Sequence, residues 1–336
     1  MKILLFGRDG QIGWELQRSL AVLGELVALG RDSVANPNGL CGDFIDLAGL
    51  AETVRRVAPD VVVNAAAHTG VDSAESEPES ARTLNALAPA VLAAEVNRRG
   101  AWLVHYSTEY VFDGSGTRPW QESDPTGPLN VYGQTKLEGE QAVATCARHL
   151  ILRTSWVYAA RGNNFARTML RLAGERDALT VIDDQFGAPT SAELLADVTA
   201  HTLRIAMARP ELAGLYHCVA AGETSWHAYA CYVLEQALEL GWVLKTGPQQ
   251  VAAVATANYP TPARRPLNSR LDTSRLQAVF GLHMPHWKVH ARRMLQEIAP
   301  TAAGAPSLAP QPPVSGAKAS SWPVDRAPAC TRPPKS

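Results

Sequence analysis

The chain has 336 residues, of which 46% are hydrophobic and 19% are charged, enough apolar material for one large domain or two smaller ones. Its net charge of -1 gives no electrostatic reason to expect nucleic acid or a membrane surface as a partner. No apolar run approaches the ~18 residues of a membrane span, and five scattered cysteines without a CxxC pair predict reduced thiols in a cytoplasmic protein, without a zinc site.

The first residues follow a pattern typical of nucleotide-binding folds. Residues 2–6 form a short apolar run, which predicts a buried strand. Gly7, Gly10 and Gly13 follow at regular spacing, and apolar residues then recur at a helical period. Such a turn lets the backbone approach a pyrophosphate, while the helix N-terminus supplies N–H donors. The spacing is GxxGxxG rather than GxGxxG, and a glycine loop that serves only close packing is the alternative.

The end of the next predicted strand, residues 25–29, bears on the choice of cofactor. In such folds this strand end faces the adenosine ribose, where an acidic side chain binds a free 2′-hydroxyl and an arginine accepts a 2′-phosphate. Arg31 therefore favours NADPH, whereas Asp32 beside it keeps NADH possible. A solvated loop arginine is the simpler alternative.

The following segments add candidate contacts to an adenine and a nicotinamide. Asp43 and Phe44 are expected to end a third strand, with Asp43 near the adenine amino group and Phe44 packed beside the ring. Residues 60–64 predict another buried strand, and the small residues 65–67 after it would let a cofactor lie against the backbone. His68, which comes next, is more typical of a structural hydrogen-bonding group than of a catalytic one.

A hydroxyl pair closes the fifth predicted strand, residues 101–106, which follows a long helix expected at residues 78–98. Ser107 and Thr108 stand where a substrate carbonyl would be polarised, and Thr108 could donate a hydrogen bond to its oxygen. Serine and threonine are also common turn formers at strand ends.

Tyr132 and Lys136 lie four residues apart in a helix predicted at residues 129–143, so their side chains share one face. A phenol titrates near pH ~10 in isolation, and a nearby ammonium favours its ionised form. The pair could therefore donate and accept a proton closer to neutral pH. A tyrosine four residues before a lysine also arises by chance in many helices.

The second half predicts further elements and one candidate anion site. Strands are expected at residues 149–156, 179–182 and 215–219, and helices at 165–172, 192–207, 226–240 and 287–298. The segment 264–270 is rich in hydrogen-bond donors, with Arg265, Asn268 and Ser269 as candidates for a nucleotide diphosphate; a solvated basic loop is the alternative. Residues 300–336 are dominated by alanine, proline, serine and glycine, which predicts a disordered tail.

Together these residues resemble the extended short-chain dehydrogenase/reductase family, in particular members that act on dTDP-linked sugars. The resemblance runs from Met1 to about Pro300 and is far more specific than a glycine turn. It is carried by FGRDGQIGWEL (6–16), NAAAHT (64–69), residues 72–78, YSTEYVF (106–112), PLNVYG (128–133), RTSWVY (153–158), GNNFA (162–166) and DQFGAPT (184–190).

The resemblance implies an α/β fold with a Rossmann-type, doubly wound parallel sheet and a smaller α/β C-terminal lobe for the substrate. The dinucleotide-binding domain would span residues 1–155, with segments at about 179–208 returning to it, and the lobe would span mainly 156–299. Tyr132 is implied as the proton donor. Lys136 is implied to bind the nicotinamide ribose, and Thr108 takes a third catalytic position that is serine in many relatives.

Binding contacts also carry over by resemblance. Those to the cofactor are Gly7, Gly10, Gln11, Ile12, Gly13, Asp43, Phe44, Ala67, His68 and Thr69. Those to the sugar nucleotide are Thr108, Glu109 and Trp156. Some members carry aspartate where this chain has Gly30-Arg31, a departure that supports NADPH. Some members also hold a structural magnesium ion at a homodimer interface through three glutamates, which correspond to Glu15, Glu193 and Glu297.

The implied reaction is hydride transfer from NADPH, or NADH, to C4 of dTDP-4-dehydro-β-L-rhamnose. Its product, dTDP-L-rhamnose, would supply a cell-surface polysaccharide such as the O-antigen of lipopolysaccharide. One alternative is a related nucleotide-sugar epimerase or dehydratase, which regenerates its nicotinamide in every turnover. The other is a non-catalytic regulatory homologue.

Overall fold

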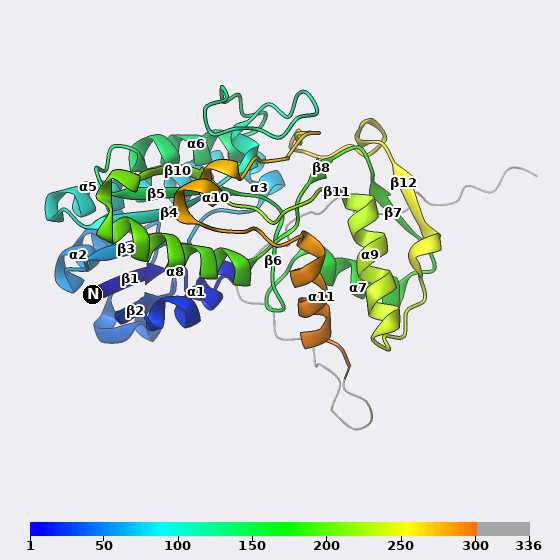
Figure 1. The fold of residues 1–336 in the computed structure, drawn as a ribbon, viewed down its shortest axis with the longest axis horizontal. Coiled ribbons are helices and arrows are strands. Elements are labelled where there is room, and N and C mark those ends of the chain that lie inside the picture. Colours follow the sequence, from blue (N-terminus) through cyan, green and yellow to red (C-terminus); the bar gives the residue numbers. More distant parts are fainter. Residues whose placement is uncertain (301–336) are drawn as a thin grey trace, which may run out of the picture.

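A six-stranded sheet, in the order β10-β5-β4-β3-β1-β2, forms the centre of the computed structural model, which describes residues 1–300 (Figure 1). All its neighbouring strands run parallel. The strands are β1 (Lys2–Phe6), β2 (Glu25–Leu29), β3 (Val61–Asn64), β4 (Trp102–Thr108), β5 (His149–Thr154) and β10 (Gly214–His217). The doubly wound α/β class predicted from the sequence is confirmed.

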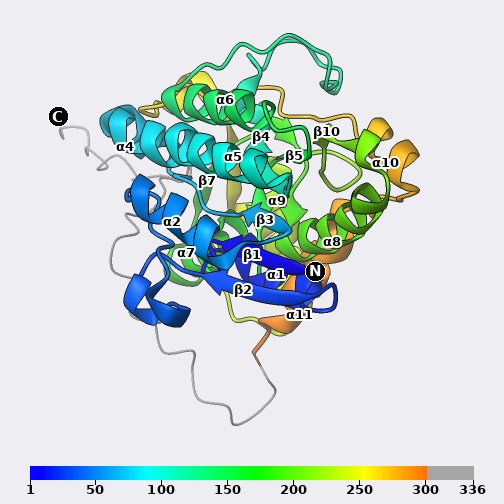
Figure 2. The ribbon, with the colours of Figure 1, turned by 90° about the vertical axis from the view of Figure 1, so that its left-hand side faces the viewer.

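The strands are apolar on both faces because helices cover both faces. Ile3 and Leu5 of β1 belong to the same core cluster as residues of helices α1 (Gln11–Ala21) and α8 (Ala192–Ala208). Leu4 and Phe6 point the other way, and their cluster includes residues of helices α2 (Leu47–Val57), α5 (Ala88–Arg99) and α6 (Val131–Val143). Figure 2 shows α5 and α6 on one side of the sheet and α1 and α8 on the other.

Asn130 determines where α6 begins, and with it the position of the Tyr132–Lys136 face. Its backbone is extended, and its side chain accepts a hydrogen bond from the Gly133 N–H at 2.8 Å, which is N-capping. The same side chain donates to the Arg264 carbonyl at 2.8 Å. The start of α6 is therefore tied to a loop more than a hundred residues later in the sequence.

The helix expected over residues 78–98 is interrupted by a π-helical stretch. It consists of α4 (Pro78–Arg82), five π-helical residues (Thr83–Leu87) and α5, and α3 (Val71–Ser76) precedes it. Within the π-helical stretch, Asn85 accepts from the His68 N–H at 2.8 Å and donates to the His68 carbonyl at 3.1 Å. π-helical turns occur frequently at functional sites, and this one holds the loop that follows β3.

The chain after β5 builds a second, smaller group of elements. Three two-stranded sheets pair β7 (Leu179–Ile182) with β12 (Val251–Val254), β8 (Phe186–Gly187) with β11 (Thr224–Ser225), and β6 (Val157–Tyr158) with β9 (Thr190–Ser191). The remaining helices are α7 (Phe165–Glu175), α9 (Trp226–Glu239), α10 (Ser274–Phe280) and α11 (Trp287–Glu297). Short 3-10 turns lie at Ser33–Ala35, Pro37–Gly39, Glu109–Val111, Pro210–Leu212, Pro248–Gln250 and Thr256–Asn258.

Two sequence predictions about the sheet were wrong. Residues 42–44 form a loop instead of a third strand, because Phe44 turns into the core against Phe6 and Gly42 lies against the Gly30 carbonyl. Residues 179–182 pair with β12 rather than returning to the central sheet, which is joined instead by β10. The tail predicted for residues 300–336 lies, from residue 301 onward, outside the described residues.

Within residues 1–300, no helix combines the length and the apolar character needed to cross a membrane.

The contact between α6 and the π-helical stretch leads to a stability prediction. A methyl group on Gly139 would lie 2.0 Å from the Asn85 carbonyl oxygen, so Gly139→Ala should lower the free energy of unfolding by about 1–3 kcal/mol through overpacking. Urea unfolding measures the difference. Gly174→Ala on α7 is the control, since no described atom outside its chain neighbours and its own helical backbone lies within 4 Å of its added methyl, and alanine should there stabilise the helix by ~1 kcal/mol. Equal losses in the two variants would contradict the close approach.

Candidate active site

Tyr132 and Thr108 meet at the carboxyl end of β4, the edge of a parallel sheet where ligands bind. Thr108 is the last residue of β4, and Tyr132 lies in the first turn of α6. The hydrogen bond between the Thr108 and Tyr132 side chains lowers the pKa of the Tyr132 phenol. Burial acts more strongly in the opposite direction, as does the charge of Glu109, so that the pKa of Tyr132 is raised overall. The phenol therefore keeps its proton at neutral pH.

Lys136 reaches the sheet rather than the phenol. Its Nζ donates to the Tyr106 carbonyl at 2.6 Å and lies 3.5 Å from the His105 Nε2. Burial lowers the pKa of Lys136 to about 8, against the opposing charge of Glu140. The sequence predicted that the lysine lowers the tyrosine pKa. Here the forces on the phenol come from burial, Glu109 and Thr108, while the amine interacts with β4.

Glu109 is a buried carboxylic acid beside the hydroxyl pair. Its side chain is 3% exposed and accepts a hydrogen bond from the Thr108 hydroxyl at 2.8 Å. Burial raises the pKa of Glu109 to about 8, although hydrogen bonds from Thr108 and Ser269 favour the charged form. At neutral pH this group is mostly a neutral acid, which both donates and accepts a hydrogen bond.

The glycine turn after β1 lies directly against the loop after β3. Gly7 has a positive φ of 85°, and a methyl group there would stand 2.7 Å from the Ala66 nitrogen. A methyl group on Gly13 would stand 2.0 Å from the Gly7 carbonyl oxygen. The predicted cofactor residues thus come from the glycine turn, the first turn of α1 and the adjoining loop after β3: Gly7, Gly10, Gln11, Ile12, Gly13, Ala67, His68 and Thr69. Burial lowers the pKa of His68, so the ring is neutral.

Where the adenosine of a cofactor is expected, the structure differs partly from the prediction. Arg31 is exposed directly after β2, and Asp43 is partly exposed. Phe44 is 4% exposed and packs edge-on against Phe6, so its ring fills the core instead of lying beside an adenine. The sequence did not indicate Arg8, whose guanidinium donates to the Ala28 and Ala35 carbonyls at 3.1 Å each. Arg8 thereby ties the loop after β2 to the glycine turn.

Trp156 follows β5 with a strained backbone. Its φ of 49° is unfavourable for a large side chain, and its indole stacks on that of Trp226 with ring centroids 3.6 Å apart. A strained, over-determined residue is typical of a binding site. The side chain of Trp156 is thus held in one orientation, and its role in holding the sugar nucleotide stays a prediction.

Two predicted substrate residues serve the protein's own loops. Arg265 pairs with Asp72 through two hydrogen bonds of 3.0 and 2.7 Å, both side chains being nearly buried. Asn268 donates to the carbonyls of Ser115 and Arg118 at 3.2 and 2.8 Å. Both donors of its amide are therefore used, and the predicted contact between Asn268 and the substrate is not supported.

The three glutamates predicted to bind magnesium do not form a metal site in one copy of the chain. Among residues 1–300, no group of three or more metal-ligating side chains is close enough to hold an ion. Glu15 lies 3.7 Å from Arg18, and Glu193 lies 3.1 Å from Arg293. The carboxylates are nevertheless neighbours, because the charges of Glu193 and Glu297 raise the pKa of Glu15.

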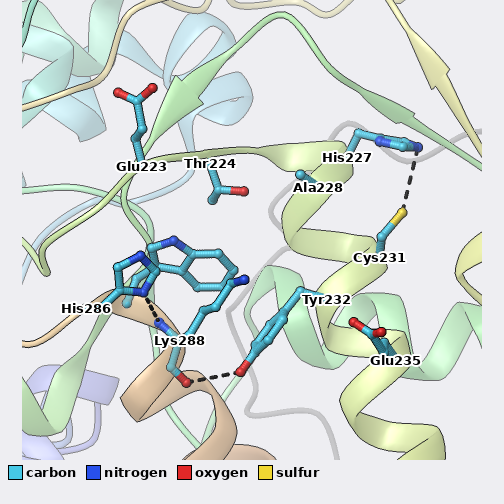
Figure 3. A pocket seen from close by; sticks show the side chains of 10 residues that line it. Glu223, Thr224, His227, Ala228, Cys231, Tyr232, Glu235, His286 and Lys288 are labelled. Atoms are coloured by element: carbon cyan, nitrogen blue, oxygen red, sulfur yellow. Dashed lines mark hydrogen bonds between the residues drawn. The ribbon is translucent and has the colours of Figure 1, made fainter.

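A separate pocket of about 490 Å³ lies between α9 and α11 (Figure 3). It contains Cys231, whose sulfur is 3.8 Å from the His227 Nε2, and His227 in turn faces Asp183 at 3.8 Å. The set resembles a thiol nucleophile with its base. However, the His227 Nε2 lies 2.9 Å from the Val251 carbonyl, to which it must donate, and burial raises the pKa of Cys231. The thiol is thus not activated.

Comparisons of sequence and of structure with known proteins match this chain over nearly all of its described residues. The model of the family described as RmlD substrate binding domain matches residues 1–299. A protein of Shigella flexneri named dTDP-4-dehydrorhamnose reductase is 58% identical over 304 residues, which cover 90% of this chain and 100% of that protein. A solved dTDP-4-dehydrorhamnose reductase of Clostridium acetobutylicum has a TM-score of 0.76 at 32% identity and covers 89% of this chain and 98% of its own. Another, of Bacillus anthracis in complex with NADP, has a TM-score of 0.77 at 30% identity, covering 88% and 99%.

The Glu109 acid leads to a prediction about stability and pH. Its pKa rises from 4.5 to about 8 on folding, so between these values the folded state binds the extra proton. The free energy of unfolding should therefore fall as the pH rises from 5 to about 8. Glu109→Gln removes this contribution, and its stability should depend less on pH than that of the wild type.

Urea unfolding at a series of pH values measures the slope. Glu52→Gln, at an exposed position of α2, controls for the loss of a carboxylate and should behave as the wild type does. A wild-type slope that persists in Glu109→Gln would show that the acid is ionised in the folded protein.

Proposed function

The chain belongs to the RmlD substrate binding domain family, and we propose that it reduces dTDP-4-dehydro-β-L-rhamnose to dTDP-L-rhamnose with NADPH. The supporting observation in the site is the hydrogen-bonded pair of Thr108 and Tyr132 at the carboxyl end of β4. The activity accords with the name of the 58% identical relative. This reaction is the final step of dTDP-L-rhamnose synthesis, and we propose that it takes place in the cytoplasm and supplies a cell-surface polysaccharide.

Reduction of a ketone needs a hydride on carbon and a proton on oxygen. The reduced nicotinamide, when bound, supplies the hydride that forms the new C–H bond at C4. Tyr132 gives its proton to the carbonyl oxygen, and Thr108 donates a hydrogen bond to the same oxygen as negative charge develops. Because the Tyr132 pKa is raised by burial, the phenol releases its proton only to an oxygen that has become strongly basic.

The neighbouring groups suit a sugar nucleotide. Glu109, as a neutral acid, can exchange hydrogen bonds with a sugar hydroxyl without placing a buried charge beside the developing oxyanion. Trp156, fixed by its stack on Trp226, offers a flat apolar wall. Arg265 holds the adjoining loop through Asp72, so we propose that it shapes this part of the site, with Ser269 bonded to Glu109.

The glycine turn fits a dinucleotide. Gly7 and Gly13 leave no room for side chains where a pyrophosphate would approach the backbone. The first turn of α1, a helix that the structure describes completely, carries no acidic side chain that would repel phosphate. We propose that the exposed Arg31 binds the 2′-phosphate of NADPH and that Asp43 lies near the adenine.

A homodimer with a shared magnesium ion is a further part of the proposal. The mutual repulsion that raises the pKa of Glu15 would be relieved by a cation, and oxygen ligands suit magnesium. Trp14, beside Glu15 on α1, is 46% exposed and would be covered by a second copy. The ion would have to displace Arg18 and Arg293 from the carboxylates, and we propose that its role is structural rather than catalytic.

Tyr132→Phe tests the proton donor. Removal of the hydroxyl leaves the ring packed against Tyr110 but should lower kcat by about 10²-fold, which is the contribution of general acid catalysis. NADPH absorbance followed with the 4-keto sugar nucleotide measures turnover, and one NADPH should be consumed per substrate. Near-normal turnover in the variant, or turnover without net NADPH loss, would contradict the proposal. The second outcome would indicate an epimerase or dehydratase.

Arg31→Ala tests the cofactor. Loss of the guanidinium should raise the KM for NADPH by tenfold or more, the order expected for a lost charge-assisted contact of about 1.5–3 kcal/mol, while the KM for NADH changes little. Arg56→Ala, at another exposed arginine of the same part of the fold, is the control. Equal effects on both cofactors would remove Arg31 from the phosphate site.

Removal of metal tests the proposed magnesium ion. The same assay with a chelator should leave kcat unchanged, whereas sedimentation in the presence of the chelator should show a smaller assembly than the homodimer.

A further inference from the structure

Three buried polar side chains form a line behind the catalytic edge of the sheet. Asn64 ends β3, His105 is its register partner on β4, and Lys136 comes from α6. Asn64 and His105 are each 1% exposed and Lys136 is 3% exposed. Buried polar groups are costly unless each donor faces an acceptor, so the direction of every hydrogen bond in this line can be worked out.

Asn64 determines the direction of the hydrogen bonds among these three side chains. Its Oδ1 accepts a hydrogen bond from the Ala66 N–H at 3.0 Å, so the Nδ2 group is the part of the amide that faces the His105 Nδ1, at 3.1 Å. An amide nitrogen donates and does not accept. The His105 Nδ1 must therefore carry a lone pair.

The state of the imidazole follows from that lone pair. A doubly protonated ring would place an N–H against the Asn64 N–H, and burial together with the Lys136 charge lowers the pKa of His105 well below its ordinary value. The ring is therefore neutral, with its proton on Nε2. This N–H faces the Lys136 Nζ at 3.5 Å.

A protonated N–H that faces an amine constrains that amine. The Lys136 Nζ has an acceptor in the Tyr106 carbonyl at 2.6 Å. An ammonium would satisfy this carbonyl but would set a second donor against the His105 N–H. An uncharged amine satisfies both neighbours, since it donates to Tyr106 and accepts from His105. We propose that Asn64 and His105 form a directional hydrogen-bond chain that makes His105 a positioning residue, which disfavours the ammonium form of Lys136.

Charged groups on the neighbouring elements do not replace this effect. On α6 itself, the charge of Glu140 favours the ammonium, but Glu140 is paired with Arg153 of β5 through two bonds of 2.8 and 2.7 Å. Other charged groups on elements packed against α6 have partners or targets elsewhere: Glu75 accepts from the Val131 N–H, Arg82 pairs with Glu138, and Glu109 acts on Tyr132. Asp72 of α3 pairs with Arg265, Glu95 of α5 pairs with Arg55 and Arg98, and Glu79 of α4 and Arg99 of α5 are exposed.

The consequence concerns proton exchange near neutral pH and rests on the proposed function. An ordinary lysine remains charged until about pH 10, whereas Lys136, with its pKa lowered to about 8, can release and regain a proton at working pH. Tyr132 loses one proton in every turnover of the proposed reaction. By influencing the protonation of Lys136, His105 thus affects how Tyr132 regains its proton after each turnover.

Nuclear magnetic resonance tests the chain without reference to activity. In ¹⁵N-histidine-labelled protein, assigned by comparison with His105→Leu, the His105 Nε2 should be protonated and the Nδ1 unprotonated. In Asn64→Asp the carboxylate should reverse this tautomer, because it accepts from Nδ1–H. The opposite tautomer in the wild type would overturn the proposal.

The lysine is titrated in ¹³C-lysine-labelled protein, with the signal assigned by Lys136→Met. Asn64→Asp should raise the Lys136 pKa by roughly 1–3 units, the size of the effect of a nearby opposite charge or hydrogen bond. Asn97→Asp is the matched control, since its amide also accepts from a backbone N–H and donates to a backbone carbonyl, and it should not move the lysine signal.

A double-mutant cycle separates the hydrogen-bond chain from direct charge. If the chain acts through His105, most of the upward shift in Asn64→Asp should vanish in the Asn64→Asp/His105→Leu variant. An equal shift in both backgrounds would mean that His105 transmits nothing. These measurements stand even if the enzyme reduces a different substrate, whereas a failure of the proposed function alone would appear only in the NADPH assay.

Discussion

An amine inside the protein, against the middle of the sheet, is the constraint on which the site depends. The Lys136 side chain is stabilised there by the Tyr106 carbonyl, and this requires α6 to pack tightly over β4. Every residue of β4 is buried, and α6 is located by its Asn130 cap and by the close approach of Gly139 to Asn85. The positions of Tyr132 and Thr108 relative to each other follow from that packing, and the hydrogen bond between their side chains joins them directly.

Local patterns were enough to predict the elements that bear the chemistry. A strand, glycine turn and helix depend on residues close in sequence, and so does the spacing of Tyr132 and Lys136, which the structure does place on one helix. The direction of the Lys136 side chain could not be predicted, because it depends on a carbonyl of another strand. The strand expected to end at residues 42–44 did not form for a similar reason, since Phe44 packs in the core against Phe6, a residue distant in the sequence.

Polar residues near the site were the hardest to interpret from the sequence. Asn268 and Arg265 have the chemistry of phosphate ligands, yet their donors hold the loops around the site. His105 and Asn64 were not predicted from the sequence, although polar side chains within strongly apolar strands must have partners in the interior. Their direction of hydrogen bonding needed the Ala66 contact, which is a feature of the folded backbone.

The π-helical stretch at Thr83–Leu87 makes the helix irregular but places Asn85 where it holds the loop after β3. A π-turn holds one residue more than the α-helical turn it replaces, and here the surplus lies where Asn85 secures both backbone groups of His68. A shortening by one residue would give a more regular helix from residue 78 to 99 and rotate Asn85 away from that loop. The extra residue of the π-helical stretch thus keeps the loop after β3 aligned with the glycine turn.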